Sequence, residues 1–293
     1  TIQKASISNP RISDSNKAFK NLATDWRFCK SLSLMIPLST ESEEFFTRLR
    51  EELLTLTIQK GTISSQLKPL TEALATQCFL NEYAYSISQE EEESVARLIN
   101  QATSNQEAFN KYLAIIGCYK AIHAAHFKVD LINNYPTSEE SSKELIQTQF
   151  SEPLQEKEIK RSLQDSPNTT NTTSQLVQKM YEQNPYPRFK YANHTIKELA
   201  KPIFNFIEIE TSRQNLTFPE ALSSTNATPK VLIAGCGTGN QVINASRYKN
   251  AQIIAIDLSS SSLAYAIRKA KEYEMNNVYF KKTVNHFFNN LEP

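Results

Sequence analysis

The sequence predicts an all-α N-terminal domain followed by an incomplete parallel α/β sheet. Apolar residues recur at helical spacing in the first half of the chain, where the pattern is helical throughout. A polar stretch at 166–174, without any large apolar residue, then separates the two parts. Beyond it, apolar runs at 230–234, 251–256 and 277–280 alternate with helical patterns, which is typical of parallel strands joined by helices. The run at 230–234 is expected to form a strand that is buried on both faces of this sheet.

These patterns set the expected domain boundaries. Residues 1–20 are polar and are expected to form a loose N-terminus. The helical domain is expected over 21–165, the linker over 166–174 and the α/β domain over 175–293.

Four helices are expected in the N-terminal domain. Thr40 and Glu43 match the capping-box pattern for the first helix, and Ser88 and Glu91 match it for the third. The acidic run after Ser88 places negative charge at the positive end of that helix, so it is interpreted as a cap and not as a binding patch. The helices are predicted from 40 to a loop at 60–62, from 66 to 85, from 88 onward and from 105 to 127, with one or two exposed helices over 136–163.

Histidine and cysteine offer weak signals for a site. His123 and His126 are three residues apart on the fourth expected helix and could share a metal ion. No third ligand stands at useful spacing, so ordinary packing or surface roles are favoured. The four cysteines, Cys29, Cys78, Cys118 and Cys236, are isolated in the sequence and match no metal-site or disulfide spacing. Cys78 is interpreted as a small core residue.

Composition excludes several classes of partner. The formal net charge of +1 gives no field that would gather nucleic acid. The sequence contains no apolar run of transmembrane length and no signal-peptide pattern. We therefore expect a cytoplasmic protein without a nucleic-acid or membrane partner.

One stretch predicts a ligand site. The chain has only 5 glycines, and three of them, Gly235, Gly237 and Gly239, follow the apolar run at 230–234. Such a cluster lets the backbone turn tightly against a ligand. Asp257 ends the next predicted strand, where a carboxylate can accept the hydroxyls of a ribose. Asn240 stands where the dinucleotide fingerprint needs a further glycine, which disfavours a nicotinamide cofactor.

The stretch from Val231 to Gly239 resembles motif I of the class I S-adenosylmethionine-dependent methyltransferases, which have a Rossmann-like fold. The resemblance extends through 257–266, 181–188 and 77–83. This combination is similar to a bacterial subgroup often joined to tetratricopeptide repeats, although no 34-residue period occurs in this chain.

The resemblance implies S-adenosyl-L-methionine as the cofactor and methyl transfer to an unknown acceptor. It places the cofactor-binding residues at Ala234, Gly235, Cys236, Gly237, Gly239, Asp257 and Leu258. Asp257 would accept from the ribose, and Leu258 would contact the adenine. Tyr181, Tyr186 and Arg188 would line a lid over the cofactor or, equally, form a rigid turn that packs on the sheet. No catalytic base is assigned.

Two features depart from the family. Ile233 stands where many relatives have an acid, and Lys281 and Lys282 follow the third predicted strand, where an acidic residue usually lies near the adenine. Three predicted strands also fall short of the family's sheet. We therefore expect a fragment holding the first half of the catalytic domain, inactive alone. The alternative is a non-catalytic helical interaction module with a degenerate nucleotide-binding fold, in which the helical domain binds a protein partner.

Overall fold

The computed structural model describes residues 21, 23–34, 39–163, 179–182, 185–210, 219, 222, 224, 225 and 228–282. The chain divides into two compact units, Thr1–Leu154 and Gln155–Pro293. The loose N-terminus predicted over 1–20 and the linker predicted over 166–174 lie outside the described residues, so both stay predictions.

The division between the units falls inside helix α10, Glu152–Ser162. This is earlier in the chain than the predicted end of the helical domain at residue 165. Glu156 and Lys160, in the part of α10 after this division, form ion pairs with other residues of the second unit. These pairs explain why this part of the helix belongs to the α/β unit.

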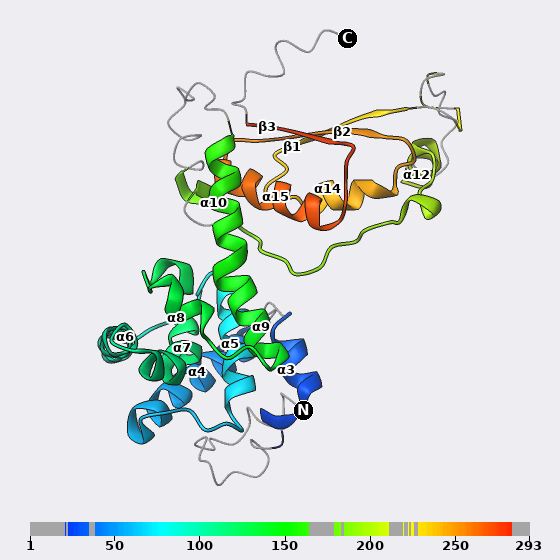
Figure 1. Ribbon diagram of the computed structural model, residues 1–293. Coiled ribbons are helices and arrows are strands. Elements are labelled where there is room, and N and C mark those ends of the chain that lie inside the picture. The colour runs from blue at the N-terminus through cyan, green and yellow to red at the C-terminus, as the bar shows by residue number, and fades with distance from the viewer. Residues whose placement is uncertain are drawn as a thin grey trace. The chain divides into compact units, whose positions relative to one another are not determined.

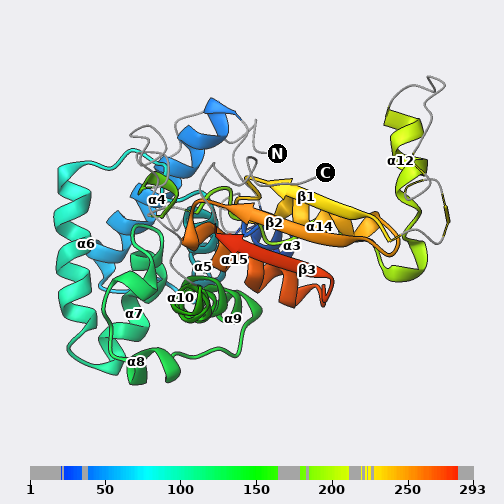
Figure 2. The ribbon, with the colours of Figure 1, turned by 90° about the horizontal axis from the view of Figure 1, so that it is seen from above.

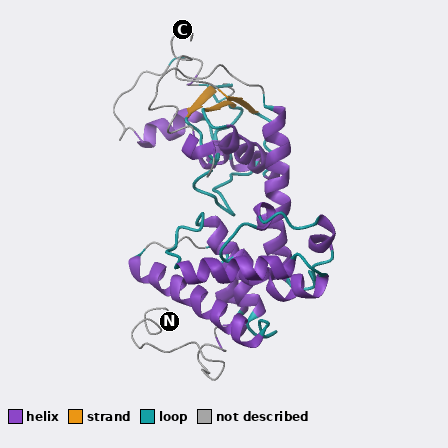
Figure 3. Ribbon diagram, turned by 90° about the vertical axis from the view of Figure 1, so that its left-hand side faces the viewer, coloured by secondary structure: helices purple, strands orange, loops and turns teal. Residues whose placement is uncertain are grey.

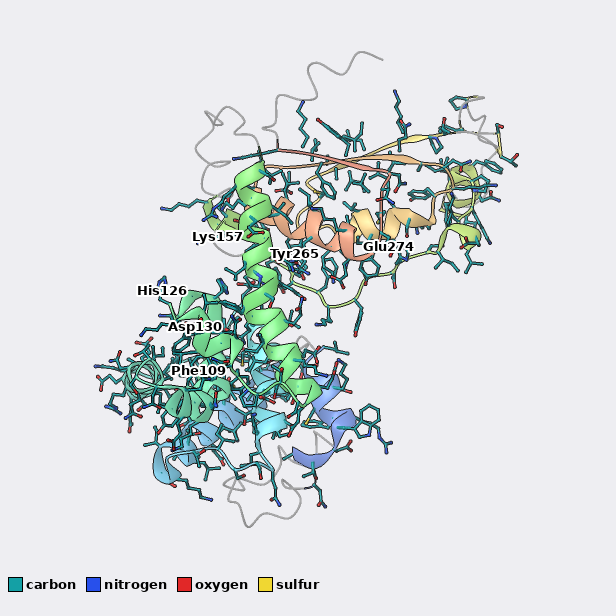
Figure 4. The ribbon with its side chains drawn as sticks, in the orientation of Figure 1. Phe109, His126, Asp130, Lys157, Tyr265 and Glu274 are labelled. Carbon is teal, nitrogen blue, oxygen red and sulfur yellow. The ribbon has the colours of Figure 1, made fainter. Side chains whose placement is uncertain are left out.

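The regular secondary structure among the described residues of the first unit is helical (Figure 3). They enclose one apolar core, in which Leu74, Phe109 and Ile115 are fully buried (Figure 4 labels Phe109). The helices are α3 (Trp26–Leu32), α4 (Thr40–Lys60), α5 (Lys68–Leu80), α6 (Gln89–Ala102), α7 (Gln106–Gly117), α8 (Val129–Asn133) and α9 (Glu140–Ile146), with a 3₁₀ turn η1 (Ile122–Ala124) and a π-helical turn η2 (Gln147–Ser151).

The two capping-box predictions have different outcomes. Ser88 caps α6 with a complete box: its hydroxyl accepts from the Glu91 N–H at 3.2 Å, and the Glu91 carboxylate accepts from the Ser88 N–H at 2.8 Å. The prediction for α4 is wrong by one residue, because Ser39 is the cap and Thr40 is already helical. Ser39 has an extended backbone (φ −140°, ψ 153°), which lets its hydroxyl accept from the Ser42 N–H at 3.3 Å.

The fourth helix is shorter than predicted, because α7 ends at Gly117 and not at residue 127. Gln149 Nε2 donates to the carbonyl oxygen of Gly117 at 2.9 Å, and the Tyr83 hydroxyl, whose one proton is shared between this carbonyl and Gln149 Oε1, lies 3.3 Å away. These bonds replace the backbone donor that a continuing helix would supply.

As a result, the two histidines do not share a helix face. His123 lies in η1, and His126 has a positive φ of 56° in the turn that follows. Both side chains are exposed, and His126 is labelled in Figure 4. No group of three or more potential metal ligands occurs among the described residues.

The segment 136–163 is helical as predicted, but it is not simply exposed. Leu145 and Gln149 are fully buried in the first unit. The Gln149 side chain donates to Ala75 O at 2.7 Å and accepts from the Tyr83 hydroxyl and the Ile122 N–H, both at 3.2 Å. The π-helical turn η2 carries Gln149, and such turns alter the helical face that the flanking residues share.

The second unit contains the three predicted strands, which form a parallel sheet in the order β1-β2-β3 (Figure 2). They are β1 (Lys230–Ala234), β2 (Gln252–Asp257) and β3 (Val278–Lys282). Leu232 pairs with Ile254, which pairs in turn with Tyr279. All three carboxyl ends therefore lie at one edge of the sheet, where ligands of such sheets bind.

Helices cover one face of this sheet: α14 (Asn240–Asn244), the 3₁₀ turn η4 (Ala245–Arg247) and α15 (Ser260–Glu272) (Figure 1). Ile253 and Ala255 are buried against them. On the other face Leu232 is 38% exposed and Tyr279 is 65% exposed. The prediction that β1 is buried on both faces is therefore wrong, because its side chains alternate between half-buried and exposed.

Residues 197–210 do not form one continuous helix but a 3₁₀ turn η3 (Lys197–Leu199) followed by α12 (Ile203–Glu210). Pro202 stands between them and disfavours the helical conformation for the residue before it. That residue, Lys201, instead forms a parallel bridge with Tyr248.

An extended segment, residues 185–192, runs along α15 on the side away from the sheet (Figure 1). We refer to it as the strap. It adds a third layer to the second unit, after the sheet and the helices. Across the described part of the whole chain, none of the helices has the length and apolar character needed to span a membrane.

Candidate functional site

The turn after β1 uses glycine at three positions with positive φ. Gly235, Gly237 and Gly239 have φ values of 68°, 52° and 91°, a region that L side chains rarely adopt. The Cys236 N–H donates to Ile256 O at 3.0 Å, which joins the turn to the end of β2. The turn is therefore fixed beside the residue that ends β2, Asp257.

Asp257 bonds directly to the glycine turn. Its Oδ2 accepts from the Gly237 N–H at 2.8 Å, and its Oδ1 accepts from the Ser259 N–H at 2.9 Å. A carboxylate offers about four lone-pair sites, so each oxygen can accept a further hydrogen bond from a ligand hydroxyl. Ala234 is exposed at the end of β1, and Leu258 is half-buried directly after Asp257.

The glycines serve different purposes. A Cβ built on Gly235 or Gly237 would have no atom within 4 Å, whereas one on Gly239 would lie 2.7 Å from the Cβ of Ala266 on α15. Gly239 is thus required for close packing of two helices. The open space beside Gly235 and Gly237 fits a ligand that lies against the turn.

Cys236 contributes through its backbone and not as a nucleophile. Its side chain is buried in the apolar core between the sheet and its helices. Burial, with the nearby Asp257 charge, raises the pKa of the Cys236 thiol to about 12. The thiol is therefore neutral at ordinary pH and unreactive.

Thr238, between the second and third glycines, joins the turn to the strap. Its hydroxyl is buried and donates to Pro187 O at 2.7 Å. The strap is held to α15 in turn, because the Tyr265 hydroxyl accepts from the Phe189 N–H at 2.9 Å and donates to Phe189 O at 2.7 Å. Two further bonds continue along the helix, from Lys269 Nζ to Lys190 O at 2.7 Å and from the Ala192 N–H to the Tyr273 hydroxyl at 2.8 Å.

The strap begins beside an ion-pair cluster on α15. Arg188 is buried and lies 3.5 Å from Glu156, while Arg268 Nε donates to the same carboxylate at 2.9 Å. The Arg188 guanidinium also lies over the Tyr265 ring. Of the two interpretations given for Arg188, lid or rigid turn, these contacts favour the rigid turn. Tyr186 is 48% exposed, and Tyr181 is half-buried.

Glu182, just before the strap, supplements the cap of α15, whose N-cap residue is Ser259. It accepts from the Ser260 N–H at 2.5 Å, from Lys160 Nζ at 2.6 Å and from the Ser261 hydroxyl at 2.9 Å. Burial raises the pKa of Glu182, but the hydrogen bonds from Lys160, Ser260 and Ser261 outweigh it and hold that pKa below its usual value. A negative charge here also suits the positive end of the helix dipole.

Sequence reasoning missed the roles of Thr238 and Glu182. Both stand inside stretches that carry the family resemblance, and a hydroxyl among glycines is a visible signal. Their partners, Pro187 and the first residues of α15, lie 51 and about 78 positions away, so local patterns do not reveal them.

The third stretch of the resemblance, 77–83, lies in the first unit. Cys78 is fully buried, which agrees with its interpretation as a core residue. Gln77 is also fully buried, and its Oε1 accepts from the Tyr85 hydroxyl at 2.8 Å. Glu82 and Tyr83 have positive φ values of 53° and 55° after the end of α5. These contacts hold the end of α5 in place.

Comparison with known protein families agrees with this geometry. Residues 231–289 match the family described as a methyltransferase domain. The match begins in β1 and includes the glycine turn, Asp257 and β3. It supports a methyltransferase domain in this part of the chain. Comparisons with curated proteins and with solved structures gave no match.

Proposed function

We propose that the second unit binds S-adenosyl-L-methionine at the glycine turn and that the protein transfers its methyl group to an acceptor. One observation carries the proposal: the Gly237 N–H is bonded to Asp257 at 2.8 Å, so the turn after β1 and the acid after β2 form one site. The match of 231–289 to a methyltransferase domain supports this cofactor.

The fit of S-adenosyl-L-methionine to this site rests on the site's hydrogen-bond donors and acceptors and on the open space beside the turn. The backbone at Ala234, Gly235, Cys236 and Gly237 would lie against the amino-acid and ribose portions, where a Cβ on either glycine would meet no protein atom. Asp257 has lone pairs for the ribose hydroxyls, and Leu258 would contact the adenine. Gly239 supports the site by letting α14 approach α15 closely.

When bound, this cofactor supplies a methyl group on a sulfonium, which carries its own leaving group. The protein's residues therefore need only to bind, orient and exclude water. Asp257 and the turn perform the binding, and the bond from Thr238 to Pro187 keeps the turn in position. The acceptor would come to the same edge of the sheet, where parallel strands end.

Calorimetric titration of the chain with S-adenosylhomocysteine tests the proposal. We expect saturable binding that Asp257→Ala weakens roughly 10–100-fold, because hydrogen bonds to a charged group contribute about 1.5–3 kcal/mol. Asp130→Ala is the matched control, since Asp130 is exposed in the first unit (Figure 4). A folded chain that fails to bind, or an Asp257→Ala variant that binds normally, would refute the site.

Asp257 also holds the glycine turn in place, so a second measurement must separate loss of cofactor contacts from loss of the turn's structure. Asp257→Asn keeps one oxygen that can accept from the Gly237 N–H, but its NH₂ group cannot accept from the Ser259 N–H, and the charge is removed. We expect this variant to melt below the parent but above Asp257→Ala, and to bind the cofactor less tightly than the parent. If no variant or parent binds the cofactor, the alternative of a non-catalytic helical interaction module is favoured.

A further inference from the structure

The first unit contains a cavity that the proposed methyl-transfer site does not use. It has a volume of about 540 Å³ and lies between α3, the start of α5 and the start of α9. Pockets for small molecules are typically about 300–1,000 Å³. The cavity is therefore large enough for a compact organic ligand.

The walls of the cavity are largely apolar. Cys29 and Ala73 are buried in its walls beside Pro69. Burial raises the pKa of the Cys29 thiol to about 11, so this side chain stays neutral. Trp26 also lines the cavity and is 71% exposed, with the Arg27 guanidinium 6.0 Å from the centroid of its ring. An aromatic ring of this kind binds both apolar groups and cations.

The charged groups that line the cavity are mostly acidic. They are the carboxylates of Glu139, Glu140 and Glu144 and the ammonium of Lys30, which sum to a formal charge of −2. Lys30 Nζ lies 3.0 Å from Glu144 Oε2, so its charge is matched by Glu144. Glu139 and Glu140 are exposed and keep the local field negative. Such a field attracts cations and repels anions.

We propose that this cavity binds a small amphipathic amine. The apolar body of the ligand lies against Cys29, Pro69 and Ala73, and its ammonium group faces Glu139, Glu140 and the Trp26 ring. Size, apolar walls and acidic mouth together select this class over a carboxylate or a phosphate. The site is separate from the glycine turn and does not depend on the proposed function.

Trp26 provides a direct readout, because it is the only tryptophan in the chain. The full chain is titrated with phenylbutylamine, and its fluorescence is followed with selective excitation of tryptophan. Two probes of matched size are compared with it: phenylbutyrate, which is negatively charged, and phenylbutanol, which is uncharged. We expect a saturable change with the amine, and at least about tenfold weaker binding of the carboxylate. Absence of saturation, or equal affinities for amine and carboxylate, would overturn the proposal.

Two variants locate the binding. The double variant Glu139→Gln with Glu140→Gln should bind the amine about tenfold more weakly and should bind phenylbutanol like the parent. The control, Glu90→Gln with Glu92→Gln, makes the same change of charge at exposed positions on α6 and should bind the amine like the parent. Ala73→Leu should reduce binding of all three probes by filling the cavity, with circular dichroism used to verify that the variant is folded. Amine binding unchanged in either cavity variant would place the site elsewhere and contradict the proposal.

Discussion

The two units use buried polar groups in opposite ways. In the first unit such groups lie in the middle of the core: Glu72 and Gln149 are fully buried, and their partners come from distant segments. In the second unit the polar contacts run along the outside of α15, where they hold the strap. The first arrangement closes a core, whereas the second leaves the strand ends accessible. The proposed cofactor site lies at these strand ends.

The largest effect is expected from Glu72→Ala in the first unit. Glu72 accepts from the hydroxyls of Tyr135, Ser141 and Ser142 at 2.7–2.8 Å, and Lys68 Nζ lies 3.6 Å away. Removing this buried carboxylate leaves its donors unpaired and should cost about 3–5 kcal/mol. Chemical denaturation followed by circular dichroism measures the loss.

The control for this change is Glu107→Ala, on the exposed surface of the same unit, where Glu107 accepts from Lys111 at 2.8 Å. It should leave the midpoint nearly unchanged. Hydrogen exchange should quicken in α5 and α9 of Glu72→Ala, while α15 keeps its protection. Similar losses in the two variants would show that the buried network has no special importance.

The next effect is expected from Gly239→Ala in the second unit. The new Cβ would lie 2.7 Å from the Cβ of Ala266, and the alanine would have to adopt a φ of 91°. Steric strain and overpacking together should cost about 3 kcal/mol. Adding Ala266→Gly should recover only a part of the contact cost, because the Cα of residue 266 would still lie 3.0 Å from the new Cβ, and it should not recover the backbone cost. The double variant should therefore be more stable than the sum of the two single changes predicts.

Gly235→Ala is the matched control for the contact, because its φ is similar while its Cβ would meet no atom within 4 Å. It should lose stability only through backbone strain, about 1–2 kcal/mol. If the stability costs of Gly239→Ala and Ala266→Gly simply add in the double variant, close packing is not the reason for glycine at position 239.

The smallest effect is expected from Glu182→Gln, which weakens the cap of α15. The pKa of Glu182 is lower in the folded chain than in the unfolded one, where it is about 4.3. Its ionised form therefore contributes stability that is fully present above that value and is lost as the pH falls through the folded pKa. The variant should be less stable by up to about 1 kcal/mol at neutral pH, and the difference should vanish in acid.

Thermal melts of the parent and of Glu182→Gln between neutral and acidic pH measure how the stability difference depends on pH. Glu274→Gln is the control at the other end of α15, where Glu274 is exposed (Figure 4). A negative charge there does not favour the helix dipole, so its loss should not destabilise the chain. A constant difference for Glu182→Gln across the pH range would show that its charge has no part in the cap.

Local patterns were sufficient for the three strands and the glycine turn. An apolar run followed by glycines identified β1, and Asp257 ends β2 as expected. The roles given to individual residues toward a cofactor stay predictions. The extent of the domain beyond the three strands also stays a prediction.

Failures arose where distant residues decide the outcome. The end of α7 depends on Gln149, which lies 32 positions after Gly117 and donates to its carbonyl. Exposure of β1 depends on how many layers cover the sheet, which the strand's own apolar residues do not reveal. Within the site, the contact between Thr238 and Pro187 depends on the course of the strap, which no local pattern indicates.

The strap also affects the order in which the second unit can fold. Its bonds to Tyr265 and Tyr273 join residues 76 and 81 positions apart, so the strap is synthesised well before the helix that holds it. Contacts of such sequence separation require closure of a long loop, and proteins rich in them fold more slowly than proteins rich in local contacts. On the ribosome, the first unit can complete its helical core before α15 has been synthesised, and until then the strap has no helix to bind. The strap therefore makes late closure of the second unit an inherent part of its assembly.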